Sequence, residues 1–415
     1  MAKKENRHAE LVSASANIEA PYELPEGWKW IPLLKSFENK TSSNKKLPTK
    51  DYSDAGKYAI IDQGQEFIGG YSDKTDFVFD GELPIIIFGD HTKCIKYIDF
   101  PFIQGADGVK ILKPISIVDS KYFYYALQNI HFPDLGYRRH FPIFKDYQFP
   151  LPPTLAEQQR IVNRIETMFA KLDQAQEKAQ VVLDSFETRK AAILHKAFTG
   201  QLTANWRKEN GVLDDSWEEK TVGDCCVEVK VGIVIKPTRY YTEAEKGIPA
   251  FRSANVRENH IDDFDWVYIN DEGMKNEQRS IVHTNDVLVV RSGAPGTACV
   301  VTDQFDGYNA IDILIAVPTQ DIINSYFLCY YTNSPMGKNI VAEKKRGLGL
   351  THFNVKGYSA TPIKVPTLPE QQEIVRILET VLEKESRAKE AAQTVLDQIA
   401  LLKKSILARA FRGEL

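Results

Sequence analysis

The chain has 415 residues, of which 43% are hydrophobic, and its formal net charge is −4. A single hydrophobic core rarely extends over so many residues, so the length predicts two or three domains. The weakly acidic charge excludes a protein that is basic over its whole surface, although a DNA-binding face needs only a local positive field.

In chain order, residues 1–20 read as a polar tail and residues 21–152 as a first globular domain of the mixed α/β class. Runs of β-branched and aromatic residues predict strands near 57–62, 83–88, 95–97 and 109–112. A short helix is expected near 122–128. The run Ile85-Ile86-Ile87-Phe88 has the length of a buried strand.

Polar and basic residues of this first domain are suited to DNA contact. Glutamine and lysine side chains can read base edges, and basic residues interleaved with aromatics can hold phosphates. The DNA-binding candidates here are Gln63, Gln65, His91, Thr92, Lys93, Tyr137, Arg138, Arg139, His140 and Lys145.

Residues 153–202 predict a long helix with the apolar spacing of a coiled coil. Pro153 stands at its start, Thr154 and Glu157 have the spacing of a capping box, and Gly200 ends it. The apolar positions alternate four and three residues apart: Ile161, Ile165, Met168, Leu172, Ala175, Ala179, Val182, Phe186, Arg189 and Ile193. Residues 203–216 are expected to be a linker.

Residues 217–365 read as a second α/β domain, with strands near 287–290, 298–301 and 311–317 and a helix near 325–331. Arginine and asparagine directly after strand-like runs suit base contacts. The candidates in this domain are Arg252, Ser253, Asn255, Arg291, Ser292, Lys344, Lys345, Arg346, Thr351 and Lys356. Both domains therefore end in a basic cluster with aromatics just before a long helix.

Residues 366–415 repeat residues 153–202 without a gap, and 25 of the 50 aligned positions are identical, which fixes the architecture. The second apolar stripe is Ile374, Leu378, Val381, Glu385, Ala388, Ala392, Val395, Ile399, Leu402 and Ile406. We expect the two copies to pair antiparallel with their alanines near the middle. The alternative is that each helix packs only on its own domain.

Catalytic and metal-binding motifs are missing from the sequence. There is no P-loop, no HExxH and no amino-methyltransferase signature, and Glu343-Lys344-Lys345 lacks a partner carboxylate for a nuclease site. His91 and Cys94 have no second pair of metal-ligand spacing. No apolar run approaches the ~18 residues that span a bilayer, and no secretory signal is evident. Five cysteines without CxxC favour a reducing cytoplasm.

The whole plan resembles the specificity (S) subunit of type I restriction–modification systems. The resemblance lies in Pro-Thr-Leu-x-Glu-Gln-Gln at 153–159 and 366–372 and in Ile-Leu-x-x-Ala-Phe-x-Gly-x-Leu at 193–202 and 406–415. Thr-Ala-Asn-Trp-Arg at 203–207 is also similar, and Trp28 and Trp217 match the openings of that family's two target recognition domains. The chain differs in its polar tail and in lacking a second such phrase after Leu415.

The resemblance implies two target recognition domains separated by a long antiparallel two-helix coiled coil, in an internal pseudo-twofold repeat. Each domain would read one half of a bipartite DNA site, and the coiled coil would set the spacer between the halves. This chain would bind no cofactor. Two modification subunits would carry S-adenosylmethionine for adenine-N6 methylation, and restriction (motor–nuclease) subunits would use ATP and Mg²⁺. Subunit docking and helix pairing would fall on Glu157, Gln158, Ile161, Ile165, Phe198, Glu370, Gln371, Ile374, Leu378 and Phe411.

Two other functions stay open from the sequence. A non-catalytic coiled-coil scaffold with two protein-binding heads would show the same repeat, but its assembled complex would not lose DNA affinity steeply with salt. A duplicated hydrolase or transferase would be expected to carry the same acid–base pair in both halves, and no such pair is visible.

Overall fold

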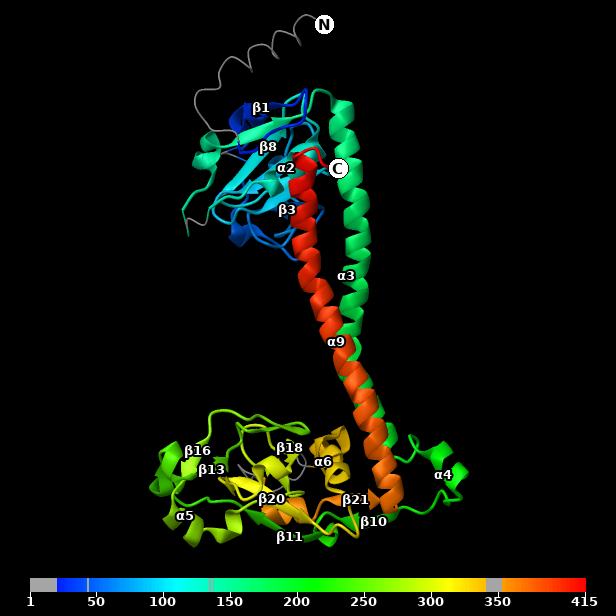
Figure 1. Cartoon of the computed structure of the whole chain (residues 1–415). Helices are drawn as coiled ribbons and strands as arrows, with labels where there is room; N and C mark the ends of the chain where they lie inside the picture. Colours follow the sequence, from blue (N-terminus) through cyan, green and yellow to red (C-terminus); the bar gives the residue numbers. More distant parts are fainter. Residues whose placement is uncertain (1–20, 43–44, 134–135, 137, 341–352) are drawn as a thin grey trace, which may run out of the picture. The chain divides into compact units, whose positions relative to one another are not determined.

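The structure is a computed structural model that describes all residues except 1–20, 43–44, 134–135, 137 and 341–352. It divides into two compact units. The first comprises residues up to Gln180 together with Gln393–Leu415, and the second comprises Val181–Ala392. The 44-residue helices α3 (Leu155–Phe198) and α9 (Leu368–Phe411) each contribute residues to both units (Figure 1). No helix in the described ranges is long and apolar enough to cross a membrane.

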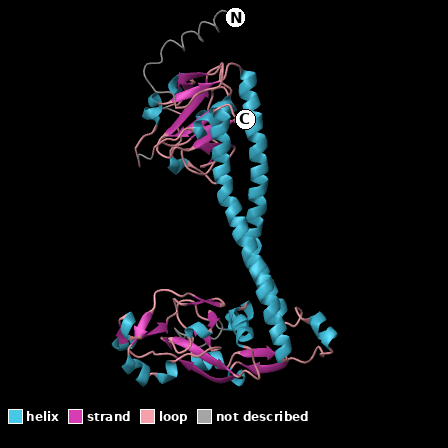
Figure 2. Cartoon of the chain, viewed as in Figure 1, coloured by secondary structure: helices cyan, strands magenta, loops and turns pink. Residues whose placement is uncertain are grey.

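Among the described residues of the first unit, the strands form three small sheets and α2 is the short α-helix. Figure 2 shows these strands gathered beside the long helices. The four-stranded sheet has the order β2-β8-β5-β6, the three-stranded sheet β4-β3-β7, and β1 pairs with β9. Their bounds are β1 Lys29–Pro32, β2 Phe37–Asn39, β3 Tyr58–Ile61, β4 Gly70–Ser72, β5 Ile85–Gly89, β6 Ile95–Ile98, β7 Phe102–Gln104, β8 Val109–Pro114 and β9 Gln148–Leu151, with helix α2 at Ser120–Asn129.

The second unit repeats this plan with additions. Its main sheet has the order β11-β20-β17-β18, its second sheet β12-β16-β13-β19, β10 pairs with β21, and β14 with β15. The strands are β10 Glu218–Thr221, β11 Cys226–Val231, β12 Tyr241–Thr242, β13 Ile248–Phe251, β14 Val256–Arg257, β15 His260–Ile261, β16 Val267–Ile269, β17 Val287–Val290, β18 Ala298–Val300, β19 Asn309–Ala310, β20 Ile313–Pro318 and β21 Pro362–Val365. The short helices are α4 Ala204–Asn210, α5 Asp271–Asn276, α6 Ser325–Asn333 and α8 Val355–Ser359.

The two domains share their topology although their sequences have diverged. In both, the second strand of the main sheet runs antiparallel to its two neighbours. Each smaller sheet also has one parallel pair, β3 with β7 in the first unit and β13 with β19 in the second. Apolar β-branched runs make the central strands β5 and β17, and every residue of both is buried. The predicted strands and short helices are all present, so the expected mixed α/β class is confirmed.

Each unit pairs α3 with α9 in antiparallel directions. In the first unit, Lys403 bonds to Asp173 at 2.5 Å and lies over the ring of Phe169. In the second unit, Arg189 bonds to Glu385 at 2.8 Å. In the first unit the earlier Arg160 bonds to the later Leu415 carbonyl, and in the second unit Lys389 lies over the ring of Phe186, ahead of the Arg189–Glu385 pair. Within each unit, increasing numbers on α3 therefore meet decreasing numbers on the α9 segment, which is the predicted antiparallel arrangement.

The predicted apolar stripe of α9 is correct only in part. Ala388, Val395 and Leu402 are exposed, while Leu396 and Lys403, one residue further on, are half-buried. A helix with 3.6 residues per turn drifts relative to a strict heptad repeat. The contact stripe is displaced by one residue at Val395 and Leu402, whereas Ile399 and Ile406 keep the predicted positions. On α3 all ten predicted positions are buried or half-buried.

Most residues predicted for subunit docking are instead buried inside the units, which corrects that assignment. The first turns of each long helix pack on the domain that precedes them, and the last turns pack on a domain core as well. Phe198 touches Phe327 of α6, and Phe411 touches Tyr122 of α2 in the equivalent position. The buried members are Gln158, Ile161, Ile165, Phe198, Glu370, Gln371, Ile374, Leu378 and Phe411, and Glu157 is half-buried.

Two repeated glutamines explain why the helices are fixed to their domains. Gln158 accepts from the Asp119 backbone N–H at 2.7 Å and donates to the Ile117 carbonyl at 3.0 Å. Gln371 makes the same two bonds, to the Asn324 N–H and the Ile322 carbonyl. Asp119 and Asn324 are the N-cap residues of α2 and α6. Each glutamine thus ties a long helix to the start of a domain helix.

The glycine ends of the long helices are confirmed, since Gly200 and Gly413 both have φ of 75°. The capping boxes form only in part. Thr154 Oγ1 accepts from the Glu157 N–H at 3.2 Å, but the Glu157 carboxylate bonds to Arg160. In the part of the chain that the structure describes, neither glutamate bonds back to its threonine, because Glu370 also bonds to an arginine.

That second arginine lies in the segment expected to be a linker. Arg207, on helix α4, donates to Glu370 at 2.6 Å and to the Gly200 carbonyl at 2.8 Å. In the first unit Arg160 plays the matching part, bonding to Glu157 and to the Leu415 carbonyl at 3.1 Å. Each arginine neutralises the glutamate at the start of one long helix and bonds to a backbone carbonyl that follows the end of the other, Gly200 after α3 and Leu415 after α9. Residues 203–216 were expected to be a linker, but they include helix α4, whose Arg207 connects the end of α3 to the start of α9.

Candidate nucleic-acid interface

Three loops meet at one edge of the main sheet in each unit. In the first unit β2 and β5 both run antiparallel to β8, so their C-terminal ends lie at the same edge. The same holds for β11 and β17 around β20. We call these segments the first-strand loop (40–42 with 45–47, and 232–236), the central-strand loop (90–94 and 291–297) and the basic loop (138–145 and 353–356, the latter running into α8).

In the first unit, Asp90 joins the central-strand loop to the basic loop. Its carbonyl accepts from the His140 N–H at 2.7 Å, and its carboxylate accepts from the Phe141 N–H at 2.8 Å. Its own N–H donates to the Gly108 carbonyl at 2.7 Å. A buried carboxylate that receives backbone donors is held in place, so Asp90 fixes the shape of this edge.

In the second unit, Arg291 occupies the equivalent position and has an equivalent role. Its Nε donates to the Phe353 carbonyl at 3.1 Å, and its guanidinium pairs with Asp312. The side chain is largely buried. Arg291 was predicted to contact bases, and the structure corrects this, because its donors are engaged inside the domain. The basic loop is thus attached at the same place in both domains.

A cleft of about 440 Å³ lies among the three loops of the first unit. Lys46, Lys110 and Arg139 line it, together with the carboxylates of Asp90 and Asp107. The hydrogen bond from Lys46 holds the pKa of the exposed Asp107 below its ordinary value. Lys110 lies 3.8 Å from Asp90. Three cations against two carboxylates leave a positive balance, which suits a phosphodiester. The other lining residues include Asn39, Thr41, Ser42, His91 and Gln104.

Gln63 connects the loops around this cleft and is not placed to read bases. Its Nε2 donates to the Asp107 carbonyl at 2.9 Å and its Oε1 accepts from the His91 N–H at 3.2 Å. Thr92 Oγ1 donates to the Gln63 carbonyl at 2.6 Å. Because these polar groups are engaged, the predicted DNA contacts of Gln63 and Thr92 are corrected to a positioning role. Gln65 is exposed, so its assignment stays a prediction.

Two further candidates are corrected because they are buried. His140 is 0% exposed, and its Nδ1 lies 3.0 Å from the Asp90 carbonyl. Asn255 is also 0% exposed and bonds to the Arg252 N–H and the Phe264 carbonyl. Arg252 pairs with Asp265 at 2.8 Å. His140 and Asn255 therefore hold loops together from inside, whereas Arg252 is half-buried and its role stays a prediction.

The remaining candidates lie at the surface or outside the described ranges. Arg138, Arg139, Lys145 and Lys356 are exposed, which fits phosphate contact. His91, Lys93, Ser253 and Ser292 are half-buried, and their roles stay predictions. Tyr137, Lys344, Lys345, Arg346 and Thr351 lie outside the described residues.

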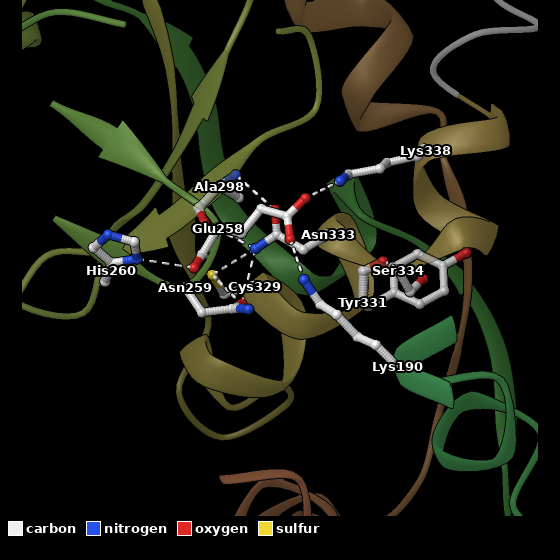
Figure 3. A network of polar contacts seen from close by, with 10 residues as sticks. All are labelled: Lys190, Glu258, Asn259, His260, Ala298, Cys329, Tyr331, Asn333, Ser334 and Lys338. Carbon is white, nitrogen blue, oxygen red and sulfur yellow. Dashed lines mark hydrogen bonds and ion pairs between the residues drawn. The ribbon is translucent and has the colours of Figure 1, made fainter. Parts of the chain in front are cut away.

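A polar network next to the second domain's central sheet fixes the turn between β14 and β15 (Figure 3). The Glu258 carboxylate lies between the ammonium groups of Lys190, on α3, and Lys338. Asn333, at the end of α6, donates to Asn259 and to the Ala298 carbonyl at 2.8 Å. Burial alone would raise the pKa of Glu258, but the two lysine hydrogen bonds outweigh it and lower that pKa. The network anchors the turn to the long helix.

The sequence reasoning missed Lys46, Lys110 and Asp90. Lys110 follows a glycine turn within the alternating pattern of β8, which marks it as a residue on the less buried face. Lys46 sits in a lysine-rich loop that looks like an ordinary solvated segment. Only the sheet topology brings these residues to Arg139, which is far away in sequence.

The family comparison decides what these domains are. The family model "Type I restriction modification DNA specificity domain" matches residues 25–183 and 214–395, one copy on each half. The chain belongs to this family. The resemblance inferred from the repeated phrases is therefore confirmed, as are its two target recognition domains.

Curated relatives and solved structures agree with this assignment. The EcoBI specificity subunit of Escherichia coli is 25% identical over 65% of this chain and 59% of its own length, so the match spans little more than half of that relative. The EcoR124I/EcoR124II specificity subunit is 24% identical over 85% of this chain and 86% of its own. The HsdS subunit from Thermoanaerobacter tengcongensis shares the fold, with a TM-score of 0.58, 16% identity and coverage of 96% of this chain and 100% of that one. A chain from a type I R-M system gives a TM-score of 0.65 at 17% identity, covering 95% of this chain and 100% of that one.

Proposed function

We propose that this chain is the DNA sequence-recognition subunit of a type I restriction–modification complex, with each recognition domain reading one half of a bipartite site. The observation that carries the proposal is the same three-loop edge built twice. The strands and the attachment of the basic loop are kept in both domains, while the exposed loop residues differ. A shared fold with different exposed loop residues is what we expect of two recognition domains that bind half-sites of different sequence.

The chemistry of the first domain's edge supports nucleic acid as the ligand. Lys46 comes from the first-strand loop, Arg139 from the basic loop and Lys110 from strand β8, and all three line one cleft. Cations brought together in this way position phosphates, whereas specificity comes from groups that reach base edges. Gln65 and His91, at or beside the same edge, remain the candidates for that second role.

We further propose that the chain acts without catalysis of its own. Modification subunits would bring S-adenosylmethionine and methylate adenine, and restriction subunits would use ATP and Mg²⁺. Among the described residues no group of three His, Cys, Asp or Glu side chains could hold a metal ion. We place the protein in the cytoplasm, where those cofactors and the DNA are found, and the five free thiols accord with that compartment.

The exposed apolar residues of α9 are better docking candidates than the buried ones predicted from the repeat. Val395 is 37% exposed, Leu401 66% and Leu402 47%. Leucine and valine grouped on one exposed helix segment are typical of a surface that another chain covers. We assign this segment of the first unit to contact with a partner subunit.

The test is a methylation map of cells with and without the gene. We expect an adenine in a split motif to lose methylation when this chain is deleted. Replacing residues 21–152 by another recognition domain should then change one half of the motif and leave the other half unchanged. An unaltered map after deletion would contradict the proposal and would favour a protein scaffold.

A further inference from the structure

Two adjacent apolar side chains project from the first-strand loop of the second unit. Val234 is 49% exposed and Ile235 is 73% exposed, and they follow the end of strand β11 at Val231 after two intervening residues. Scattered apolar residues are common at protein surfaces, but an adjacent β-branched pair at a loop tip is costly to hydrate. Lys236 follows them and is exposed as well.

The loop that carries this pair is held firmly at its root. Ile233 is 2% exposed, donates from its N–H to the Ala310 carbonyl at 2.8 Å, and accepts from the Asp312 N–H at 3.0 Å. A Cβ on Gly232 would collide with the Ala310 carbonyl. Lys236 has φ of 45°, a left-handed conformation that a residue with a side chain adopts only when its surroundings impose it. Val234 and Ile235 therefore project from a fixed support.

The same hydrogen bonds place the pair beside the basic loop. Asp312, which binds the root of the loop, pairs with Arg291, and Arg291 binds Phe353 at the start of the described part of the basic loop. The first unit has Thr41, Ser42 and Lys46 in the equivalent loop, where they line the cationic cleft. The apolar pair thus stands where the first domain presents its polar cleft.

We propose that Val234 and Ile235 form a wedge that enters the stack of duplex DNA between neighbouring base pairs. Isoleucine and other apolar side chains inserted from the minor groove unstack a base step and bend the duplex, and flanking cations hold the phosphates on either side. Lys236 and Lys356, both exposed, supply such cations. The proposal rests on the proposed DNA-reading function and assigns to the second domain a different mode of contact from the first.

The experiment uses the assembled methylating complex and the motif found by the methylation map. A synthetic duplex of that motif carries 2-aminopurine at each position of the second domain's half-site in turn. Wild-type complex should raise the fluorescence at one step, because unstacked 2-aminopurine is brighter. Val234→Ser with Ile235→Ser should abolish this rise and weaken binding by about tenfold or more, since two buried apolar side chains are lost.

Val227→Ser is the matched control. Val227 is 72% exposed on the same strand β11 but lies at its opposite end, away from the three loops. It should leave both fluorescence and binding unchanged. The wedge would be overturned, and the DNA-reading function kept, if the methylated motif depends on the gene but 2-aminopurine fluorescence is the same with the wild-type complex and with the double variant. Loss of co-purification with the modification subunit by the double variant would also overturn it, because the pair would then be a protein contact. Absence of any gene-dependent motif would refute the DNA-reading function itself.

Discussion

Replacing Arg207 by methionine should strongly destabilise the second unit. Arg207 is almost buried and donates to Glu370, whose side chain is 0% exposed. Without the arginine, the Glu370 carboxylate keeps the Thr203 hydroxyl at 2.6 Å, and its Oε2 already lacks a hydrogen-bond partner. The Gly200 carbonyl at the end of α3 would lose its donor as well. The variant therefore leaves a buried charge with little compensation.

The expected magnitude follows from that orphaned charge. Removing one partner of a buried ion pair costs about 3–5 kcal/mol. In a unit of roughly 210 residues, each kcal/mol lowers the melting temperature by about 2–4 °C, so the transition should fall by about 6–20 °C. Differential scanning calorimetry of the full chain measures this shift, and hydrogen exchange identifies the unit that unfolds.

The internal repeat provides a matched control. Glu157 is the counterpart of Glu370, but it pairs with Arg160 on the same exposed helical turn. Glu157→Gln should cost no more than about 0.5 kcal/mol. Adding Glu370→Gln to Arg207→Met should restore much of the lost stability, because the buried charge is gone. Equal shifts for Arg207→Met and Glu157→Gln, or no recovery in the double variant, would refute the reasoning.

Three further outcomes are expected. Lys110→Gln and Arg139→Gln should each reduce the salt dependence of DNA binding by about one ion, whereas Lys29→Gln, at an exposed position of β1 that does not line the cleft, should not. Equal slopes for all three variants would exclude the cleft as a phosphate site. The turn held by Glu258 should be protected from hydrogen exchange above pH about 4.5 and should lose that protection as the pH falls through the lowered pKa of Glu258, because protonation ends both lysine bonds. Glu258→Gln should remove this pH dependence. A variant with the same pH profile as the wild type would contradict the assignment. Phe411→Ala should destabilise the first unit by about 3–5 kcal/mol in calorimetry, while Leu402→Ala, at an exposed position on the same helix, should have little effect.

Local patterns identified the secondary structure because those patterns have a local physical cause. The run 85–88 is apolar and β-branched, and it forms the buried centre of the main sheet. The stripe of α3 was predicted correctly over its whole length, whereas that of α9 was shifted by a residue at Val395 and Leu402. The displacement on α9 is local, because Ile399 and Ile406 on the same helix are buried or half-buried as predicted.

Among the site residues, sequence reasoning recognised kinds of side chain more reliably than their orientations. Arg138, Arg139, Lys145 and Lys356 proved to be exposed, as phosphate contacts require. Gln63, His140, Asn255 and Arg291 looked the same in sequence but point into the domain. Whether a polar side chain turns inward depends on which backbone groups need a partner there, and those groups belong to loops distant in sequence.

The sequence by itself determined the duplicated helices, the two α/β domains and the family, because periodicity and repeated phrases are written in neighbouring residues. Tertiary structure alone decided that Asp90 and Arg291 hold equivalent positions, that Arg207 and Arg160 each join the ends of the long helices, and that Lys46, Lys110 and Arg139 share a cleft. The physical reason is that antiparallel sheets bring the ends of alternate strands to one edge, so the chemistry of that edge is assembled from segments that no sequence window contains.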